Sequence, residues 1–257
     1  GDGMGAVEHY MPKQLQSVED ADIDESVTRI LAGIYKLRLD QTTKCTPPEC
    51  KDHILRKVTS PAHVQLARHI AAHSAVLLKN EGDILPLRSD SVRSIAIIGA
   101  AAAGKPFDAN TDGAWNTGDY YSGGGSGHMS MKSDVAVTTL DGLRRRAKLE
   151  GIEVYTSPSN DVVVGTAAAQ RADVAIVVAG ATSGEGLDRA NLLLDGNANE
   201  LISRVGAMAR RTIVLMQIPG VVVVPWKDDV DGILALFMGG QETGNAWADV
   251  LFGDVPP

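Results

Sequence analysis

Positive charge is scarce in this chain of 257 residues. Its 24 lysines and arginines face 32 aspartates and glutamates, which leaves a formal net charge of −8. A phosphate-binding surface needs the opposite sign, so we expect no nucleic-acid partner. Long apolar runs are also lacking, because Gln217, Pro219 and Gly220 interrupt the apolar residues between 213 and 224, and we expect no membrane span. The chain starts at Gly1 without a basic and apolar leader, which suggests a processed chain or a piece of a longer one.

Cysteine is almost absent. Cys45 and Cys50 are the only two, and they lie in a proline-containing stretch that is typical of a linker. Their spacing leaves a local disulfide and two free thiols equally open. A zinc site needs more ligands than the nearby His53 could add, so we expect no metal there.

Two patterns that resemble cofactor sites each lack a required residue. His69 and His73 would share one face of a helix, but neither the glutamate of the metalloprotease pattern nor a third ligand accompanies them. The segment from Gly99 to Lys105 resembles a phosphate-binding loop, but Pro106 takes the place of the Ser or Thr that holds magnesium. We therefore expect no metal and no cofactor.

The first part of the chain reads as one helix followed by a linker. Apolar residues at positions 23, 27, 30, 31, 34 and 37 have helical spacing and predict a helix over residues 22–39. The sequence from 41 to 61 is polar and contains three prolines, which predicts a linker between two structural units.

The rest of the chain alternates between helical and β-branched segments. A helix is predicted at 62–76, strands at 94–98, 152–155, 173–179, 212–217 and 232–236, and further helices at 138–149, 162–171, 196–210 and 243–251. This order predicts an α/β fold with a mostly parallel sheet sandwiched by helices, a three-layer α/β/α arrangement. Ligand sites in such folds lie at the carboxyl ends of the strands, which directs attention to the loops after residues 98, 179 and 217.

Glu185 lies between Gly184 and Gly186 in the loop after the strand predicted at 173–179. Glycines allow the backbone to bend tightly, so this carboxyl group could project into a cleft as a general acid. The same pattern also fits a surface glutamate on a flexible loop.

A second glycine-rich loop contains Gly124, Gly125 and Ser126, with Trp115 and Tyr121 before it. Aromatic rings beside polar groups suit the mixed apolar and hydroxyl faces of a sugar. An ordinary flexible loop with locally packed tyrosines remains an equal alternative.

Several segments, in the same order along the chain, resemble the family 3 glycoside hydrolases. Residues 24–31 are similar to the helix that ends the family's N-terminal barrel domain, and residues 67–87 to the start of its α/β sandwich domain. The Gly-Gly-Gly-Ser-Gly run at 123–127 looks like the family's sugar-site loop, and residues 183–189 match its Ser-Gly-Glu-Gly…Asp-Arg segment. Residues 239–242 and 248–254 resemble the family's closing motifs.

The resemblance implies a domain division and a set of site residues. Residues 1–40 would be the tail of a barrel domain, 41–61 the linker, and 62–257 the α/β sandwich domain that carries the acid/base. Glu185 would be the general acid/base, and Asp188 and Arg189 would support its loop. The sugar-binding residues would be Gly124, Gly125, Ser126, Trp115 and Tyr121.

The resemblance also implies a reaction, the hydrolysis of terminal β-linked glucosyl residues by a retaining β-glucosidase-type enzyme. The substrate would be a β-glucoside or short oligosaccharide, and no cofactor is expected. Such enzymes need two carboxyl groups, and the family's nucleophile, an aspartate in a Ser-Asp-Trp-like segment of the barrel, is not found among residues 1–21. We expect this chain alone to be inactive and to need a barrel-bearing segment or chain. The alternative is a noncatalytic sugar-binding or assembly module that has lost the nucleophile. Secretion or a lumenal location is implied by the resemblance alone.

Overall fold

The computed structural model describes residues 16–41, 56–107, 118–129, 131 and 134–257. Contacts divide the chain into two compact units, residues 1–58 and 59–257. Cys45, Cys50, His53 and Trp115 lie outside the described residues, so the predictions made for them stay predictions.

Among its described residues, the first unit has the long helix α3 (Asp20–Lys36), followed by the short 3-10 helix η1 (Leu39–Gln41). Asp20 and Asp22 lie in the first turn and Lys36 in the last, where each charge is stabilised by the helix dipole. This helix was predicted at 22–39 and is confirmed with slightly earlier bounds. None of its residues is buried, and its apolar stripe is exposed at Val27, Ile30, Leu31 and Tyr35.

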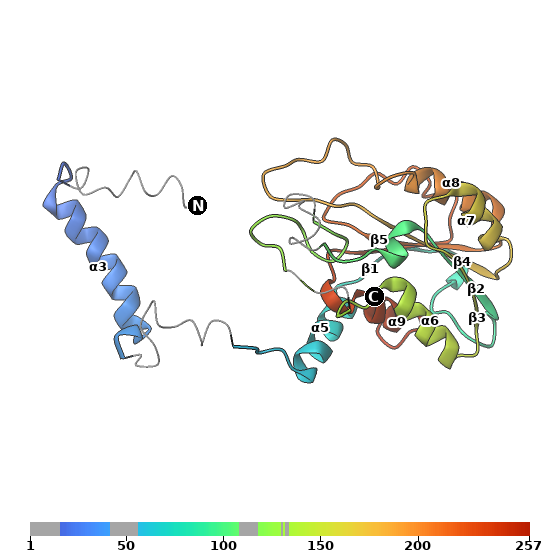
Figure 1. Cartoon of the computed structure of the whole chain (residues 1–257), viewed down its shortest axis with the longest axis horizontal. Helices are drawn as coiled ribbons and strands as arrows, with labels where there is room; N and C mark the ends of the chain where they lie inside the picture. The colour runs from blue at the N-terminus through green and yellow to red at the C-terminus, as the bar shows by residue number, and fades with distance from the viewer. Residues whose placement is uncertain (1–15, 42–55, 108–117, 130, 132–133) are drawn as a thin grey trace. The chain divides into compact units, whose positions relative to one another are not determined.

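The second unit is built on one six-stranded sheet with the strand order β1-β6-β5-β4-β2-β3 (Figure 1). The strands are β1 (Val76–Asn80), β2 (Ser94–Ile98), β3 (Glu153–Ser157), β4 (Val174–Gly180), β5 (Thr212–Gln217) and β6 (Gly232–Leu236). Strands β2 to β6 pair in parallel, and β1 pairs antiparallel with β6. The predicted mostly parallel α/β fold is confirmed.

Strand β1 was not predicted, and the helix before it is shorter than expected. The helix predicted at 62–76 is α5 (Pro61–His73), which starts with Ser60 as its N-cap. It ends at Ser74, whose hydroxyl donates to the carbonyl oxygen of Ile70 at 2.7 Å. Because β1 is an edge strand with exposed or half-buried side chains, its short apolar run lacks the buried pattern that marked the other strands.

Helices cover both faces of this sheet. One face is covered by α5, α6 (Thr139–Leu149) and α9 (Thr243–Leu251), and the other by α7 (Val162–Ala169) and α8 (Ala198–Met208) (Figure 1). Side chains alternate between the two cores, so Ile95 and Ile97 lie in the first while Ala96 and Ile98 lie in the second. In the described part of the chain, no helix combines the length and apolarity needed to cross a membrane.

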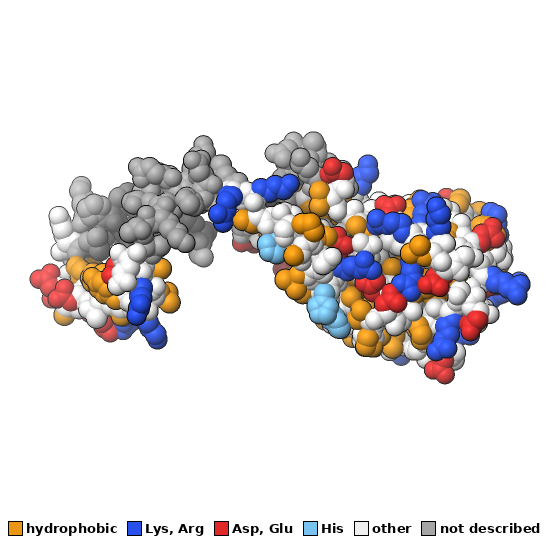
Figure 2. Space-filling view, turned by 90° about the horizontal axis from the view of Figure 1, so that it is seen from below, with side chains coloured by type: hydrophobic (Ala, Val, Ile, Leu, Met, Phe, Trp, Pro, Cys, Tyr) orange, Lys and Arg blue, Asp and Glu red, His pale blue; other side chains and the backbone are white. Residues whose placement is uncertain are grey.

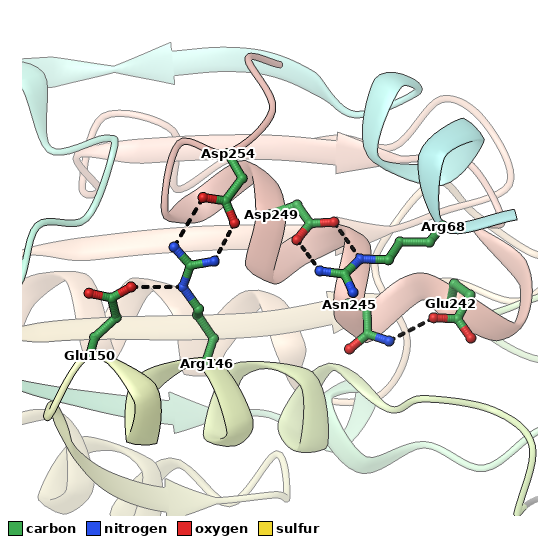
Figure 3. Close-up of polar contacts among 7 residues, drawn as sticks. All are labelled: Arg68, Arg146, Glu150, Glu242, Asn245, Asp249 and Asp254. Carbon is green, nitrogen blue, oxygen red and sulfur yellow. Dashed lines mark hydrogen bonds and ion pairs between the residues drawn. The ribbon is translucent and has the colours of Figure 1, made fainter. Parts of the chain in front are cut away.

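Ion pairs join the helices on the α5, α6 and α9 face. Arg68 of α5 holds Asp249 of α9 through two hydrogen bonds, one of them 2.6 Å from Nε to Oδ2 (Figure 3). Arg146 of α6 pairs with Glu150 at 3.0 Å and also with Asp254. On the face seen in Figure 2, charged side chains of both signs lie among exposed hydrophobic ones. The Arg68–Asp249 pair joins α5 to α9, and the Arg146–Asp254 pair joins α6 to the segment that follows α9.

We predict that Asp249→Ala destabilises the second unit. Asp249 is only 7% exposed, and its removal leaves the Arg68 guanidinium without its two-point acceptor. The expected loss is about 1–3 kcal/mol in the free energy of unfolding, measured by urea denaturation. Glu81→Ala is the matched control, because Glu81 is exposed and its pair with the half-buried Lys79 should contribute little. Equal effects of the two substitutions would contradict the prediction.

Candidate functional site

Loops from three strands meet at the carboxyl edge of the sheet. Gly124, in the long connection after β2, donates its amide to the carbonyl oxygen of Ser183 at 2.8 Å in the loop after β4. The amide of Glu185 donates back to the carbonyl oxygen of Gly124 at 3.2 Å. The loop after β5 joins them, since Val223 donates to the carbonyl oxygen of Leu192 at 2.9 Å. The two glycine loops noted in the sequence are therefore paired through their backbones.

The Glu185 side chain lies against Ser126. Its Oε2 accepts the Ser126 amide at 2.7 Å and also the Ser126 hydroxyl. These bonds to the Ser126 hydroxyl and amide hold the pKa of Glu185 below its ordinary value, although the residue is exposed. Gly125 has a φ of +97°, and an added Cβ would lie 2.3 Å from the Glu185 Cβ. Only glycine fits there, which explains the glycine beside Ser126.

We predict that Ser126→Ala raises the pKa of Glu185 toward its ordinary value, because one of the two donors to the carboxylate is lost. Carbon-13 NMR titration of the Glu185 carboxyl group in the 257-residue chain would measure this shift. At pH values above the ordinary pKa of a glutamate, the lowered pKa of Glu185 stabilises the folded chain. This stabilisation is lost as the pH falls through the lowered pKa.

The control is Ser89→Ala, since Ser89 contacts Glu150 and not Glu185. An unchanged Glu185 pKa in Ser126→Ala would show that the serine contact does not hold the carboxylate in solution.

Asp119 organises the start of the Gly124 loop. It is 5% exposed, and its Oδ1 accepts the amides of Tyr121 and Ser122, each at 2.7 Å. Its Oδ2 accepts the amide of Phe107, also at 2.7 Å. The sequence offered one signal for this role, because aspartate often accepts amides that follow it in a turn. That signal was too general to distinguish Asp119 from other loop aspartates.

The predicted sugar-contact residues occupy different places. Gly124, Gly125 and Ser126 lie beside Glu185, as described above. Tyr121 is 1% exposed, and its hydroxyl donates to the carbonyl oxygen of Gly104 at 2.6 Å, so its ring supports the loop from the interior.

Asp188 and Arg189 are on the Glu185 loop but are not paired with each other in any ion pair of the described residues. Arg189 Nη2 instead donates to the carbonyl oxygen of Val221 in the loop after β5. Both residues line a cavity of about 380 Å³, bounded by residues 182–184, 187–191 and 193–196. Glu185 does not line this cavity, which is therefore distinct from the contact with Ser126.

Asp195 and Tyr120 form a second polar contact near the loops. The Asp195 Oδ2 accepts the Thr182 amide at 3.0 Å and lies 3.4 Å from the Tyr120 hydroxyl. Burial raises the pKa of Asp195 and, together with the charge of Asp195, raises the pKa of Tyr120 to about 12. Neither residue was singled out from the sequence, because the contacts join segments 75 residues apart.

The described residues contain no group of three or more His, Cys, Asp or Glu side chains arranged to hold a metal ion. The His69 and His73 rings contact each other, with centroids 4.2 Å apart. The polar groups of the site are carboxylates, hydroxyls and backbone amides, which suit proton transfer and hydrogen bonding to a polyol.

The chain is similar to known glycoside hydrolases. Residues 75–257 match the family model of the glycosyl hydrolase family 3 C-terminal domain. A probable β-glucosidase L of Aspergillus terreus is 38% identical over 255 residues, which cover 94% of this chain and 34% of that protein. A thermostable β-glucosidase B of Acetivibrio thermocellus is 35% identical over 212 residues, covering 76% of this chain and 25% of that protein.

Solved structures of β-glucosidases are also similar to this chain. The crystal structure of a β-D-glucoside glucohydrolase from Trichoderma reesei has a TM-score of 0.79 at 29% identity, and covers 95% of this chain and 36% of that one. The β-glucosidase D2-BGL from Chaetomella raphigera has a TM-score of 0.69 at 32% identity, over 76% of this chain and 29% of that one. The chain spans about a third of the length of the curated relatives it matches.

Proposed function

The chain belongs to glycoside hydrolase family 3, and on this premise we propose that it is part of a retaining β-glucosidase-type enzyme that cleaves terminal β-linked glucosyl residues. Glu185 supplies the general acid/base in this proposal. The observation that carries it is the position of the Glu185 carboxyl group, which contacts Ser126 where two glycine loops pair at the carboxyl edge of the sheet. The substrate class is taken from the relatives, which are named β-glucosidases.

In a retaining mechanism the acid/base works twice. Glu185 would first protonate the leaving glycosidic oxygen while a second carboxylate attacks the sugar, and would then take a proton from the water that releases the sugar. The second carboxylate would come from the barrel of a larger protein. No cofactor takes part in either step.

The pKa of Glu185 bears directly on this role. A general acid must be protonated when the substrate binds, and the Ser126 contacts favour the ionised form instead. Docking of a barrel would remove water and bring the negative charge of the nucleophile close, and both effects raise a carboxyl pKa. The acid state would therefore form only in the assembled enzyme.

The other site residues have supporting or binding roles in the proposal. Gly124, Gly125, Ser126 and Trp115 would line the sugar site, where the glycines let the sugar approach the backbone closely. Tyr121, buried under the loop, would maintain its shape.

Asp188 and Arg189 would support the acid/base loop, and the Arg189 bond to Val221 is consistent with that role.

We also propose the domain division given by the family. Residues 1–40 would be the tail of the barrel, 41–61 the linker, and 62–257 the sandwich domain. The division of contacts at residues 58 and 59 supports this boundary. The exposed apolar stripe of α3 supports a barrel surface that would cover it. By family resemblance, the enzyme would be secreted or lumenal.

The 257-residue chain alone should not hydrolyse a nitrophenyl β-glucoside, because the nucleophile is expected on the barrel. Adding or fusing a barrel-bearing segment should produce activity, measured by nitrophenol release. If glucose binds but the assembled protein stays inactive, a noncatalytic sugar-binding or assembly module is the better description.

Glu185→Gln in the barrel-containing enzyme should reduce kcat/KM on an alkyl β-glucoside by about 10²–10⁴-fold. A dinitrophenyl β-glucoside should lose far less, because its leaving group needs little protonation. Glu200→Gln, an identical change at an exposed position of α8, is the matched control. Equal losses on both substrates would remove Glu185 from the acid role.

A further inference from the structure

Asp195 joins the two ends of the loop that carries Glu185. Its amide donates to the carbonyl oxygen of Gly180 at 2.9 Å, and its Oδ2 accepts the amide of Thr182 at 3.0 Å. Asp195, at the end of the loop, is therefore bonded to Gly180 and Thr182, which lie at its start beside the carboxyl end of β4.

The same carboxyl group also reaches the second glycine loop. Tyr120 lies four residues before Gly124, and its hydroxyl is 3.4 Å from Asp195 Oδ2. The Tyr120 ring is seated against two glycines, because an added Cβ would lie 2.4 Å from the ring at Gly180 and 2.8 Å at Gly104. The ring is thus packed closely, and its hydroxyl is directed to one acceptor.

A further contact ties Asp195 to the end of β2. Its carbonyl oxygen accepts from Asn160 Nδ2 at 3.3 Å, and Asn160 Oδ1 accepts the amide of Ala100 at 2.9 Å. Asp195 is therefore anchored to the neighbouring strand on one side while its carboxyl group holds both loops on the other.

We propose that Asp195 is a positioning residue for Glu185: its carboxyl group fixes both glycine loops to the sheet, and so keeps Ser126 in contact with the Glu185 carboxylate. The structural part of this inference concerns the 257-residue chain itself. Its consequence for catalysis rests on the proposed function of Glu185.

The physical reason is that the Ser126–Glu185 contact is more exposed to water than the contacts of Asp195. Ser126 and Glu185 meet on exposed loop tips, joined by a few hydrogen bonds that water can replace. Asp195 is half-buried, where its hydrogen bonds are less weakened by solvent. Loss of the buried anchor should therefore loosen the exposed contact, although Asp195 touches neither residue.

The first test is NMR of the 257-residue chain with Asp195→Ala. The amide signals of Ser126 and Glu185 should shift, and the pKa of Glu185 should rise toward its ordinary value as the Ser126 contact is lost. Asp195→Asn should restore both readouts, because its amide oxygen can still accept from Thr182 and Tyr120. Asp90→Ala, an exposed aspartate before β2, is the matched control.

The second test is kinetic, in the barrel-containing enzyme. Asp195→Ala should lower kcat on an alkyl β-glucoside by about 10- to 100-fold with a much smaller change in KM, because a misplaced acid slows the chemical step. Asp195→Asn should recover most of this rate. A loss in kcat/KM that is equal for a dinitrophenyl β-glucoside would point to general damage and overturn the positioning role, because kcat/KM reports the step in which the leaving group departs.

Two results separate this inference from the proposed function. Unchanged Ser126 and Glu185 signals in Asp195→Ala overturn the anchor, whatever the enzyme does. Shifted signals with no leaving-group effect in Glu185→Gln support the anchor while rejecting the acid role.

If Asp195→Ala fails to fold, Tyr120→Phe is the second variant. It removes only the hydroxyl contact and should move the same signals by a smaller amount. No movement of these signals overturns the anchor.

Discussion

All seven residues of β4 are buried between two layers of helices, and β5 and β6 are buried along their whole length as well. A strand covered on both faces must be apolar on both, and its parallel neighbours must be reached by crossover connections. Because strands β2 to β6 all run in the same direction, they all end at the same edge of the sheet. The burial of the sheet therefore determines where its functional loops can lie.

At the carboxyl edge, the two functional loops are joined by hydrogen bonds of the backbone. Gly124 and Ser183, and then Glu185 and Gly124, exchange backbone hydrogen bonds, so two loops without regular structure behave as a short paired ladder. Such pairing needs close approach, and Gly125 supplies it because any side chain there would strike Glu185. The glycines that make the loops look flexible in the sequence are needed for their contact.

Two carboxyl groups on one loop show how environment sets protonation. Hydrogen bonds from Ser126 lower the pKa of the exposed Glu185, whereas burial raises the pKa of Asp195. Their chemistry as isolated residues is nearly the same. The difference comes from the hydrogen-bond donors at the exposed Glu185 and from the reduced contact with water at the half-buried Asp195.

The sequence by itself determined the α/β class, the five parallel strands and the glycine loop around Glu185, because burial and turn chemistry leave periodic patterns in a single chain. It could not reveal edge strand β1, whose exposed side chains carry no such pattern. Nor could it reveal Asp119 beneath the loop, the buried position of Tyr121, or the contact of Asp195 with Tyr120. Only tertiary structure decided these, because each depends on groups distant in sequence that meet when the sheet brings its carboxyl ends together.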